Sequence, residues 1–311
     1  MNDQPILLFG ATGQIGFELD QLLAPRFTVL TPHHAEVDFT KAEDLRTYLR
    51  IARPSIIINA AAYTDVDGAE DIAAVAMAIN GDAPRIMAEE AVHQGIALIH
   101  YSTDYVFDGA GGSGEPLSPT GLRPYRESDP LGPLGVYGQS KLAGEDAIRV
   151  IAPPHLVLRT SWVYSKRRKN FMNTITRLAG EQSTLRVVDD QIGSPTWAGA
   201  IAEATVKIID KTNATAIPAM LVKFGGTYNL SAAGETNWCG FARAIVEHEW
   251  ARVTAEGEER GPAPEVVPIA TAEYPTPAAR PAYSVLDNSA VAEAFGVTMA
   301  GWRDQLDRCL R

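Results

Sequence analysis

The sequence predicts an α/β protein in which a doubly wound parallel sheet is followed by a smaller lobe formed by the C-terminal part of the chain. Short apolar runs alternate with helix-length segments over the first half, which is the pattern of βαβ units. The runs at residues 6–9 and 56–58 are apolar throughout, as parallel strands buried on both faces are. A loop with three glycines, Gly10, Gly13 and Gly16, follows the first run, where a strand would turn sharply into a helix.

Strands are expected at about residues 5–10, 27–31, 55–59, 96–102, 155–161 and 185–188. Helices fall between them: one is expected from Gln14 to Leu23, and Tyr137 opens a long one. After about residue 162 the alternation becomes irregular and turn-rich segments appear. We therefore expect residues 1–162 to form most of the first domain and residues 163–311 most of the lobe. Segments at about 185–210 and 227–230 are expected to return to the first domain.

Composition and charge narrow the class of protein. The 311 residues are 46% hydrophobic and 21% charged, which is ordinary for a globular chain. A net charge of −11 argues against nucleic acid as a partner, and no apolar run approaches the length of a membrane span. The first five residues leave no room for a signal peptide, and Cys239 and Cys309 lack metal-type spacing. We expect a cytoplasmic protein with reduced cysteines.

One loop is rich in glycine, proline and serine, from residue 109 to residue 123. Its length and its nearness in sequence to Tyr137 suit a mobile lid. A tolerated surface insertion accounts for it at least as well, and the sequence leaves both interpretations open.

The glycine loop predicts a dinucleotide site, because glycines let the backbone approach a pyrophosphate that lies on the helix N-terminus. The spacing of Gly10, Gly13 and Gly16 resembles that of the short-chain dehydrogenase/reductase superfamily, in particular its extended branch, and implies a Rossmann-type domain. At the end of the second strand, residues 31–34 read Thr-Pro-His-His, with neither a carboxylate to favour NAD nor an arginine to select NADP. NADPH is the expected cofactor, with NADH also accepted.

Tyr137 and Lys141 predict the chemistry beside that cofactor. Positions four apart share one face of a helix, so the phenol and the ammonium can point at one spot. A nearby cation should lower the pKa of the tyrosine, which suits proton exchange with an alcohol or ketone.

Several further segments carry a resemblance to one family. They lie at residues 59–70, 102–109, 124–129, 137–141, 159–164, 190–196 and 280–287. In order and density this set resembles the dTDP-4-dehydrorhamnose reductase family of bacterial dTDP-L-rhamnose synthesis, over nearly the whole chain. The resemblance implies NAD(P)H-dependent reduction of the 4-keto group of dTDP-4-dehydro-L-rhamnose, a small-molecule nucleotide-sugar.

The resemblance also implies roles for individual residues. Thr103, Tyr137 and Lys141 match the catalytic triad: Thr103 would bind the keto oxygen, Tyr137 would donate the proton, and Lys141 would hold the nicotinamide ribose. The cofactor would be bound by these last two and by Gly10, Thr12, Gly13, Gln14, Ile15, Gly16, Asp38, Ala60, Ala61, Ala62 and Tyr63. The substrate would be bound by Thr64, Val66, Thr103, Asp104, Tyr105, Trp162, Asn170, Arg280 and Ser284, with Trp162 offering an apolar face to the sugar. The basic run at residues 166–169 is either a place for a nucleotide diphosphate or a solvated loop.

The chain departs from the family in two respects, the inserted loop before Pro124 and the residues that would bind a metal. Some members bind Mg²⁺ at a dimer interface through carboxylates, of which only Glu18 remains, since residues 197–200 supply no acidic side chain. We expect no metal, and a monomer or weak homodimer. Two other functions stay open: another nucleotide-sugar 4-ketoreductase, or a non-catalytic NADP-binding regulatory protein, because the methionine adenosyltransferase β subunit resembles the same family.

Overall fold

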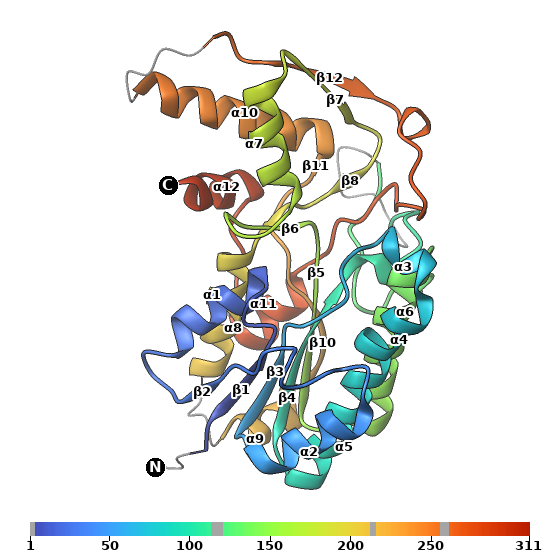
Figure 1. The fold of residues 1–311 in the computed structure, drawn as a ribbon, viewed down its shortest axis with the longest axis vertical. Helices are drawn as coiled ribbons and strands as arrows, with labels where there is room; N and C mark the ends of the chain where they lie inside the picture. The colour runs from blue at the N-terminus through green and yellow to red at the C-terminus, as the bar shows by residue number, and fades with distance from the viewer. Residues whose placement is uncertain (1–3, 113–120, 212–215, 256–260) are drawn as a thin grey trace.

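The computed structural model describes residues 4–112, 121–211, 216–255 and 261–311. It has two parts, a large α/β domain and a smaller lobe (Figure 1). Residues of both parts line a cleft. Residues 113–120, which include most of the loop expected as a lid or insertion, lie outside the described residues.

The large domain is built on a six-stranded parallel sheet with the order β10-β5-β4-β3-β1-β2. Its strands are β1 (Ile6–Phe9), β2 (Val29–Leu30), β3 (Ile56–Asn59), β4 (Ala97–Thr103), β5 (His155–Thr160) and β10 (Gly226–Asn229). β1, β3 and β4 are buried along their whole length, and each begins with a run of apolar residues. The doubly wound Rossmann-type sheet expected from the sequence is confirmed.

Helices cover both faces of this sheet (Figure 1). One face packs against α1 (Gln14–Leu23), α8 (Ala198–Asp210), α9 (Ile217–Phe224) and α11 (Ser289–Phe295). The other packs against α2 (Ala42–Ala52), α5 (Ala83–Gln94) and α6 (Val136–Ile151), with α3 (Gly68–Asp71), α4 (Ala73–Met77) and a π-helical turn (Ala78–Asp82) leading into α5.

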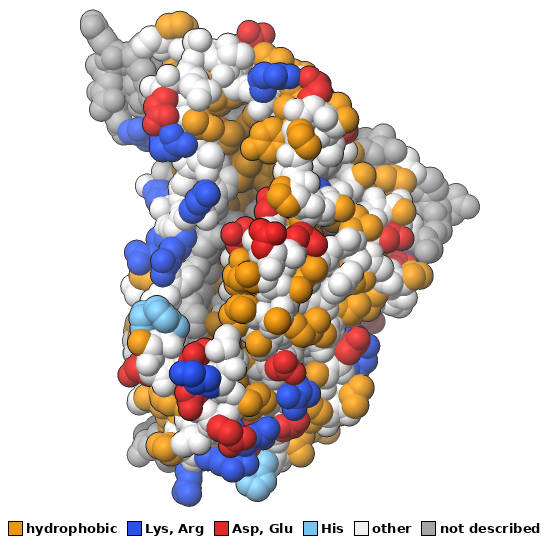
Figure 2. Space-filling model, turned by 45° about the vertical axis from the view of Figure 1, so that its right-hand side comes forward, with side chains coloured by type: hydrophobic (Ala, Val, Ile, Leu, Met, Phe, Trp, Pro, Cys, Tyr) orange, Lys and Arg blue, Asp and Glu red, His pale blue; other side chains and the backbone are white. Residues whose placement is uncertain are grey.

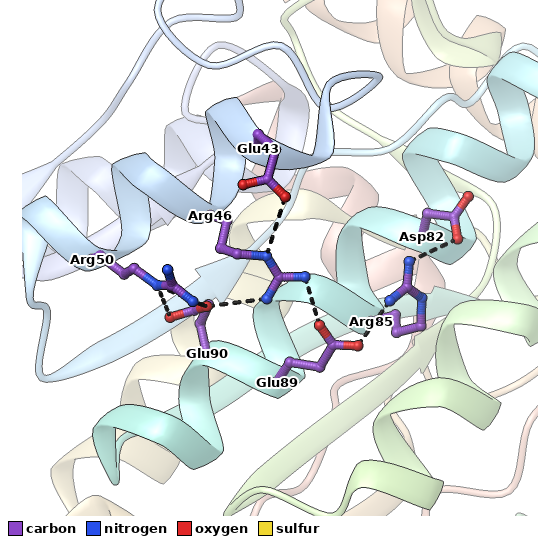
Figure 3. A network of polar contacts seen from close by, with 7 residues as sticks. All are labelled: Glu43, Arg46, Arg50, Asp82, Arg85, Glu89 and Glu90. Carbon is purple, nitrogen blue, oxygen red and sulfur yellow. Dashed lines mark hydrogen bonds and ion pairs between the residues drawn. The ribbon is translucent and has the colours of Figure 1, made fainter.

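A network of ion pairs joins α2 to α5 (Figure 3). Glu90 is buried, and its carboxylate accepts hydrogen bonds from Arg46 (3.1 Å) and Arg50 (2.8 Å) of α2. Burial raises the pKa of Glu90, but the two guanidinium groups outweigh it and lower the pKa overall. Arg46 also pairs with Glu89 (2.8 Å), so α2 is fixed by charge on its polar side and by its leucines on the sheet side.

The smaller lobe has its own apolar core, formed by α7 (Phe171–Glu181), α10 (Trp238–Ala255) and α12 (Trp302–Leu310). Two strands, β7 (Thr184–Val188) and β12 (Glu265–Ile269), pair in parallel over this core. Short strand pairs connect the lobe to the large domain: β6 (Val163–Tyr164) with β9 (Thr196–Trp197), and β8 (Ile192–Gly193) with β11 (Thr236–Asn237).

The segments expected to return to the first domain behave differently from one another. β10 joins the main sheet beside β5, and α8 packs against α1. The strand expected at 185–188 forms, but it pairs with β12 outside the main sheet. Its residues alternate between exposed and buried, as in a strand with one face in solvent, whereas β1, β3 and β4 of the main sheet are buried throughout.

Candidate active site

The main cleft opens at the carboxyl ends of the parallel strands and has a volume of about 1230 Å³. This is where open α/β sheets bind ligands. Figure 2 shows a groove running down this face, with basic side chains along one border. Residues expected at the site line it together: Gly10, Thr12, Gly13, Gln14, Ile15, Asp38, Ala60, Ala61, Ala62, Thr64, Val66, Thr103, Asp104, Tyr105, Tyr137, Lys141, Trp162 and Asn170.

The glycine loop forms the floor of the cleft between β1 and α1. Gly10 has a φ of +82°, and a side chain there would lie 2.6 Å from the carbonyl carbon of Ala60. Gly16 packs onto Gly10, so it contributes to the close approach of α1 to the loop and does not line the cleft. The backbone N–H groups at the start of α1 are thus presented to whatever occupies the cleft.

Small residues follow β3 on the opposite side of the loop. Ala60, Ala61 and Ala62 line the cleft, so a planar ligand can pass close to the backbone. Tyr63 does not line it; its backbone N–H and C=O are both bound by the side chain of Asn80, at 2.9 and 3.0 Å. This bond fixes the segment that presents Thr64 and Val66.

Thr103, Tyr137 and Lys141 converge at the end of β4 and the first turns of α6. The Tyr137 phenol is hydrogen-bonded to Thr103 and packs edge-on against the ring of Tyr105, with 5.5 Å between ring centroids. Burial raises the pKa of Tyr137 to about 12, although its side chain is partly open to the cleft. The hydrogen bond between Tyr137 and Thr103 opposes this shift and the charge of Asp104 adds to it. The expectation that Lys141 lowers this pKa is wrong for the unliganded protein, because burial dominates.

Lys141 is directed to the backbone and to a histidine. Its Nζ donates to Tyr101 O at 2.6 Å and lies 3.3 Å from His100 Nε2. Burial lowers the pKa of Lys141 to about 8, with the carboxylate of Glu145 opposing the shift. The protonated, charged form of Lys141 is therefore only weakly favoured in the unliganded site.

His100 is a residue that sequence reasoning missed. It is buried in β4, and its Nδ1 lies 3.0 Å from Asn59 Nδ2. Asn59 Oδ1 accepts the N–H of Ala61, which orients the amide so that Nδ2 faces the imidazole. Burial and the neighbouring Lys141 hold the pKa of His100 well below its usual value. The available signal was a histidine that follows the apolar residues 97–99 within one strand.

The carboxylate of Asp104 accepts hydrogen bonds from two hydroxyl groups, those of Thr103 and Ser161. Its Oδ1 accepts from Thr103 Oγ1 (3.0 Å) and its Oδ2 from Ser161 Oγ (2.9 Å). Burial raises its pKa to about 6, while hydrogen bonds from Ser284, Ser161 and Thr103 oppose the shift. Ser284 is buried beside this carboxylate and does not line the cleft.

Trp162 is stacked on Trp238, which sequence reasoning also missed. The ring centroids are 3.4 Å apart and the planes are within 2°. Gly193 lies against the same indole, since a side chain there would come within 2.5 Å of Trp162. Trp238 begins α10, so this stack joins the two parts of the molecule across the cleft.

Three other predicted residues have polar partners in the protein. Arg280 pairs with Asp67 at 2.8 Å and lies outside the cleft lining. Asn170 lines the cleft and donates to Gln14 Oε1 at 2.9 Å. Asp38, which also lines the cleft, accepts from the backbone and hydroxyl of Thr40 at 2.9 and 2.7 Å.

The basic run is divided among different contacts. The Arg167 guanidinium lies 3.7 Å from the ring centroid of Phe17, whereas Arg168 bonds the glycine loop and Lys169 lines the cleft. Glu18 lies near Glu203 of α8; burial raises its pKa, Arg167 opposes this and Glu203 adds to it. Glu203 itself pairs with Arg308. Within the described ranges, three or more potential metal-binding side chains nowhere gather at one point.

The cleft has features that suit a bound nicotinamide dinucleotide. Gly10 leaves room that a side chain would fill, and Ser102 Oγ and Thr160 Oγ1 are buried at the cleft without a hydrogen-bond partner among the described residues. Buried polar groups are normally paired, so these hydroxyls suit a ligand or water. A parallel sheet with this glycine loop and a Thr–Tyr–Lys group beside it defines an extended short-chain dehydrogenase/reductase.

Comparison with known proteins places the chain more narrowly. It belongs to the family described as RmlD substrate binding domain, which matches residues 4–311. It is 41% identical to dTDP-4-dehydrorhamnose reductase of Burkholderia thailandensis, with 98% of each chain covered. It is 38% identical to the enzyme of that name from Escherichia coli, covering 98% of this chain and 96% of the relative.

Solved structures agree with this assignment. The crystal structure of dTDP-4-dehydrorhamnose reductase from Bacillus anthracis in complex with NADP is 30% identical, covers 98% of both chains and superposes with a TM-score of 0.83. In the described part of this chain, no helix is both long and apolar enough to cross a membrane.

Proposed function

We propose that this protein reduces the 4-keto group of dTDP-4-dehydro-L-rhamnose, with NADPH as the hydride donor, to give dTDP-L-rhamnose. The observation that carries the proposal is the convergence of Thr103, Tyr137 and Lys141 in the cleft that also contains the glycine loop. The names of the relatives, at 38–41% identity over nearly the whole chain, support the substrate and the direction of reaction.

The cofactor would lie on the residues after β1 and β3. Gly10, Gly13, Gln14 and Ile15 would present backbone to its pyrophosphate, and Ala60–Ala62 would let its nicotinamide half pass toward Lys141. When bound, the nicotinamide supplies the hydride for the keto carbon.

Tyr137 is the proton donor in this proposal. Its pKa of about 12 keeps the phenol protonated throughout the neutral range, which suits a group that must give a proton to a developing alkoxide. Thr103 would donate a hydrogen bond to the same oxygen, for which its single hydroxyl hydrogen must turn from Asp104 Oδ1 to the substrate. Lys141 would turn from Tyr101 O toward the ribose and stabilise the negative charge that remains after proton transfer.

The sugar would lie against Thr64, Val66, Tyr105 and Trp162, and the lobe would bind the nucleotide. The proposed division assigns residues 1–162 mainly to the cofactor and residues 163–311 mainly to the nucleotide-sugar, and the presence of two separate apolar cores supports it. We propose a monomer or weak homodimer that acts in the cytoplasm, where the free, buried Cys239 and Cys309 would stay reduced.

The test is NADPH oxidation by the purified protein with dTDP-4-dehydro-L-rhamnose, alongside a UDP-linked 4-keto sugar. We expect turnover with the dTDP sugar, and use of NADH as well, with a preference for NADPH below about a thousandfold in kcat/KM. NADPH binding without turnover would contradict the proposal and favour a regulatory protein. Preference for the UDP sugar would favour a different 4-ketoreductase.

A further inference from the structure

The segment that follows β6 crosses to the glycine loop and is held there by Gln14. Gln14 Oε1 accepts hydrogen bonds from Ser165 Oγ and Asn170 Nδ2, both at 2.9 Å. Gln14 Nε2 donates to Val163 O at 3.3 Å. Residues 165–170 are therefore fixed against the first turn of α1, although they lie about half the chain away in sequence.

Arg168 stands in this segment over the glycine loop. Its Nε donates to Thr12 O at 2.8 Å, and both residues line the main cleft. Its backbone is left-handed, with a φ of +63°, a conformation that residues other than glycine seldom adopt and that is often found at ligand sites. Asn173 Nδ2 donates to Arg168 O at 2.8 Å and helps to hold it.

The terminal nitrogens of the Arg168 guanidinium are available to donate hydrogen bonds to a ligand. Across the described ranges, the bond to Thr12 is the only hydrogen bond or ion pair made by the Arg168 side chain, so its terminal nitrogens point to no protein acceptor. The first turn of α1 contains no acidic side chain that would neutralise it. In a protein with a net charge of −11, a cation held in this place is suited to an anion at the same loop.

We propose that Arg168 binds the pyrophosphate of the nicotinamide dinucleotide from the side opposite the α1 N-terminus. This inference rests on the proposed function only in requiring a dinucleotide on the glycine loop. The pyrophosphate is the group that such a loop receives, and a guanidinium meets phosphate oxygens with two parallel N–H donors. Residues 31–34 contain no arginine, and Arg168 acts instead on a part of the cofactor that NADPH and NADH share.

The neighbouring arginine provides a matched control. Arg167 has the same charge, but its guanidinium lies on the Phe17 ring and not on the glycine loop. The experiment measures the Kd of NADPH and of NADH by nicotinamide fluorescence, without nucleotide-sugar, for the wild type, Arg168→Ala, Arg168→Lys and Arg167→Ala. Binding without substrate separates this inference from the proposed reaction.

For Arg168→Ala we expect both Kd values to rise by the same factor, about tenfold or more, as befits a lost charge-assisted contact. Arg168→Lys should fall between the wild type and Arg168→Ala, and Arg167→Ala should stay within about twofold of the wild type. The wild-type affinity should also decrease more steeply with added NaCl than that of Arg168→Ala. Unchanged Kd values in Arg168→Ala, or a loss confined to NADPH, would overturn the pyrophosphate assignment. Equal thermal unfolding midpoints for the two alanine variants would show that folding is not the cause.

Discussion

Lys141 and His100 lie side by side in the interior of the protein, with 3.3 Å between Nζ and Nε2. Because Asn59 Nδ2 faces His100 Nδ1, the imidazole hydrogen is on Nε2 and points at the lysine. A neutral amine accepts that hydrogen, whereas an ammonium is repelled by it. Burial of Lys141 lowers its pKa to about 8, so the unliganded site favours the charged lysine only weakly.

Lys141→Met should therefore make the unliganded protein more stable at pH 7 while it weakens NADPH binding and slows turnover. The lysine pKa is lowered from 10.5 to about 8, so protonation of the native state at pH 7 costs free energy. With about 1.4 kcal/mol per pKa unit, less the lost bond to Tyr101 O, the expected gain is about 1–3 kcal/mol.

The stability advantage of Lys141→Met over the wild type depends on pH. Between pH 8 and 10.5 the unfolded wild type holds a proton that the native wild type has lost, so wild-type stability rises with pH and the advantage of the variant shrinks. Urea unfolding at several pH values measures it. Lys207→Met, at an exposed position on α8, is the control and should change stability by less than about 0.5 kcal/mol. A destabilised Lys141→Met would show that the buried charge is not costly.

Asp104→Asn should remove a pH dependence near 6 from the activity profile. In the wild type, burial raises the pKa of Asp104 to about 6, so above that pH the carboxylate competes with the keto oxygen for the single hydrogen of the Thr103 hydroxyl. We expect kcat/KM of the wild type to rise as the pH drops through about 6, and that of the variant to be flat in this range. The same dependence in both proteins would assign it to another group.

Tyr137→Phe should leave NADPH affinity nearly unchanged and lower kcat by about 10²–10⁴-fold, the usual effect of losing a general acid. Steady-state kinetics and a separate Kd for the cofactor measure the two effects. Tyr105→Phe is the control, because that ring packs on Tyr137 without a proposed part in proton transfer, and its effect should fall mainly on KM. Retention of more than about a tenth of wild-type kcat would exclude Tyr137 as the acid.

Removal of divalent ions should leave both turnover and oligomeric mass unchanged. Among the described residues, Glu203 is the acidic side chain whose charge acts on Glu18, and that carboxylate is already paired with Arg308. Mg²⁺ sites need more oxygen ligands than one free carboxylate offers. The experiment is dialysis against EDTA, followed by activity and light scattering with and without millimolar Mg²⁺. A Mg²⁺-dependent dimer, or a several-fold loss of rate on chelation, would contradict this prediction.

Much of the fold was predictable because its signals are local. The helix expected from Gln14 to Leu23 has those bounds, and the strands expected at 55–59 and 96–102 form as β3 and β4 within a residue or so. β2 is shorter than expected, only Val29–Leu30. β7 was expected at the right residues, but strand pairing depends on contacts between distant segments that a sequence window does not contain.

The site was predictable where a motif marked it and not where folding alone assembled it. The glycine loop and the Tyr137–Lys141 pair are local patterns, and both meet in the cleft. The contacts of Arg168 with Thr12 and of Trp238 with Trp162 join residues far apart in sequence. The pKa of Tyr137 was misjudged for the same reason, since its burial depends on the whole cleft.

The most direct test of the central claim follows the hydride and the proton donor together. The protein is incubated with dTDP-4-dehydro-L-rhamnose and NADPH that carries deuterium at C4 of the nicotinamide, and the sugar product is analysed by NMR and mass spectrometry. We predict dTDP-L-rhamnose with one deuterium at C4 of the sugar from the wild type, and almost none formed in the same time by Tyr137→Phe. Product without deuterium, the opposite configuration at C4, or no reaction with cofactor bound would contradict the account.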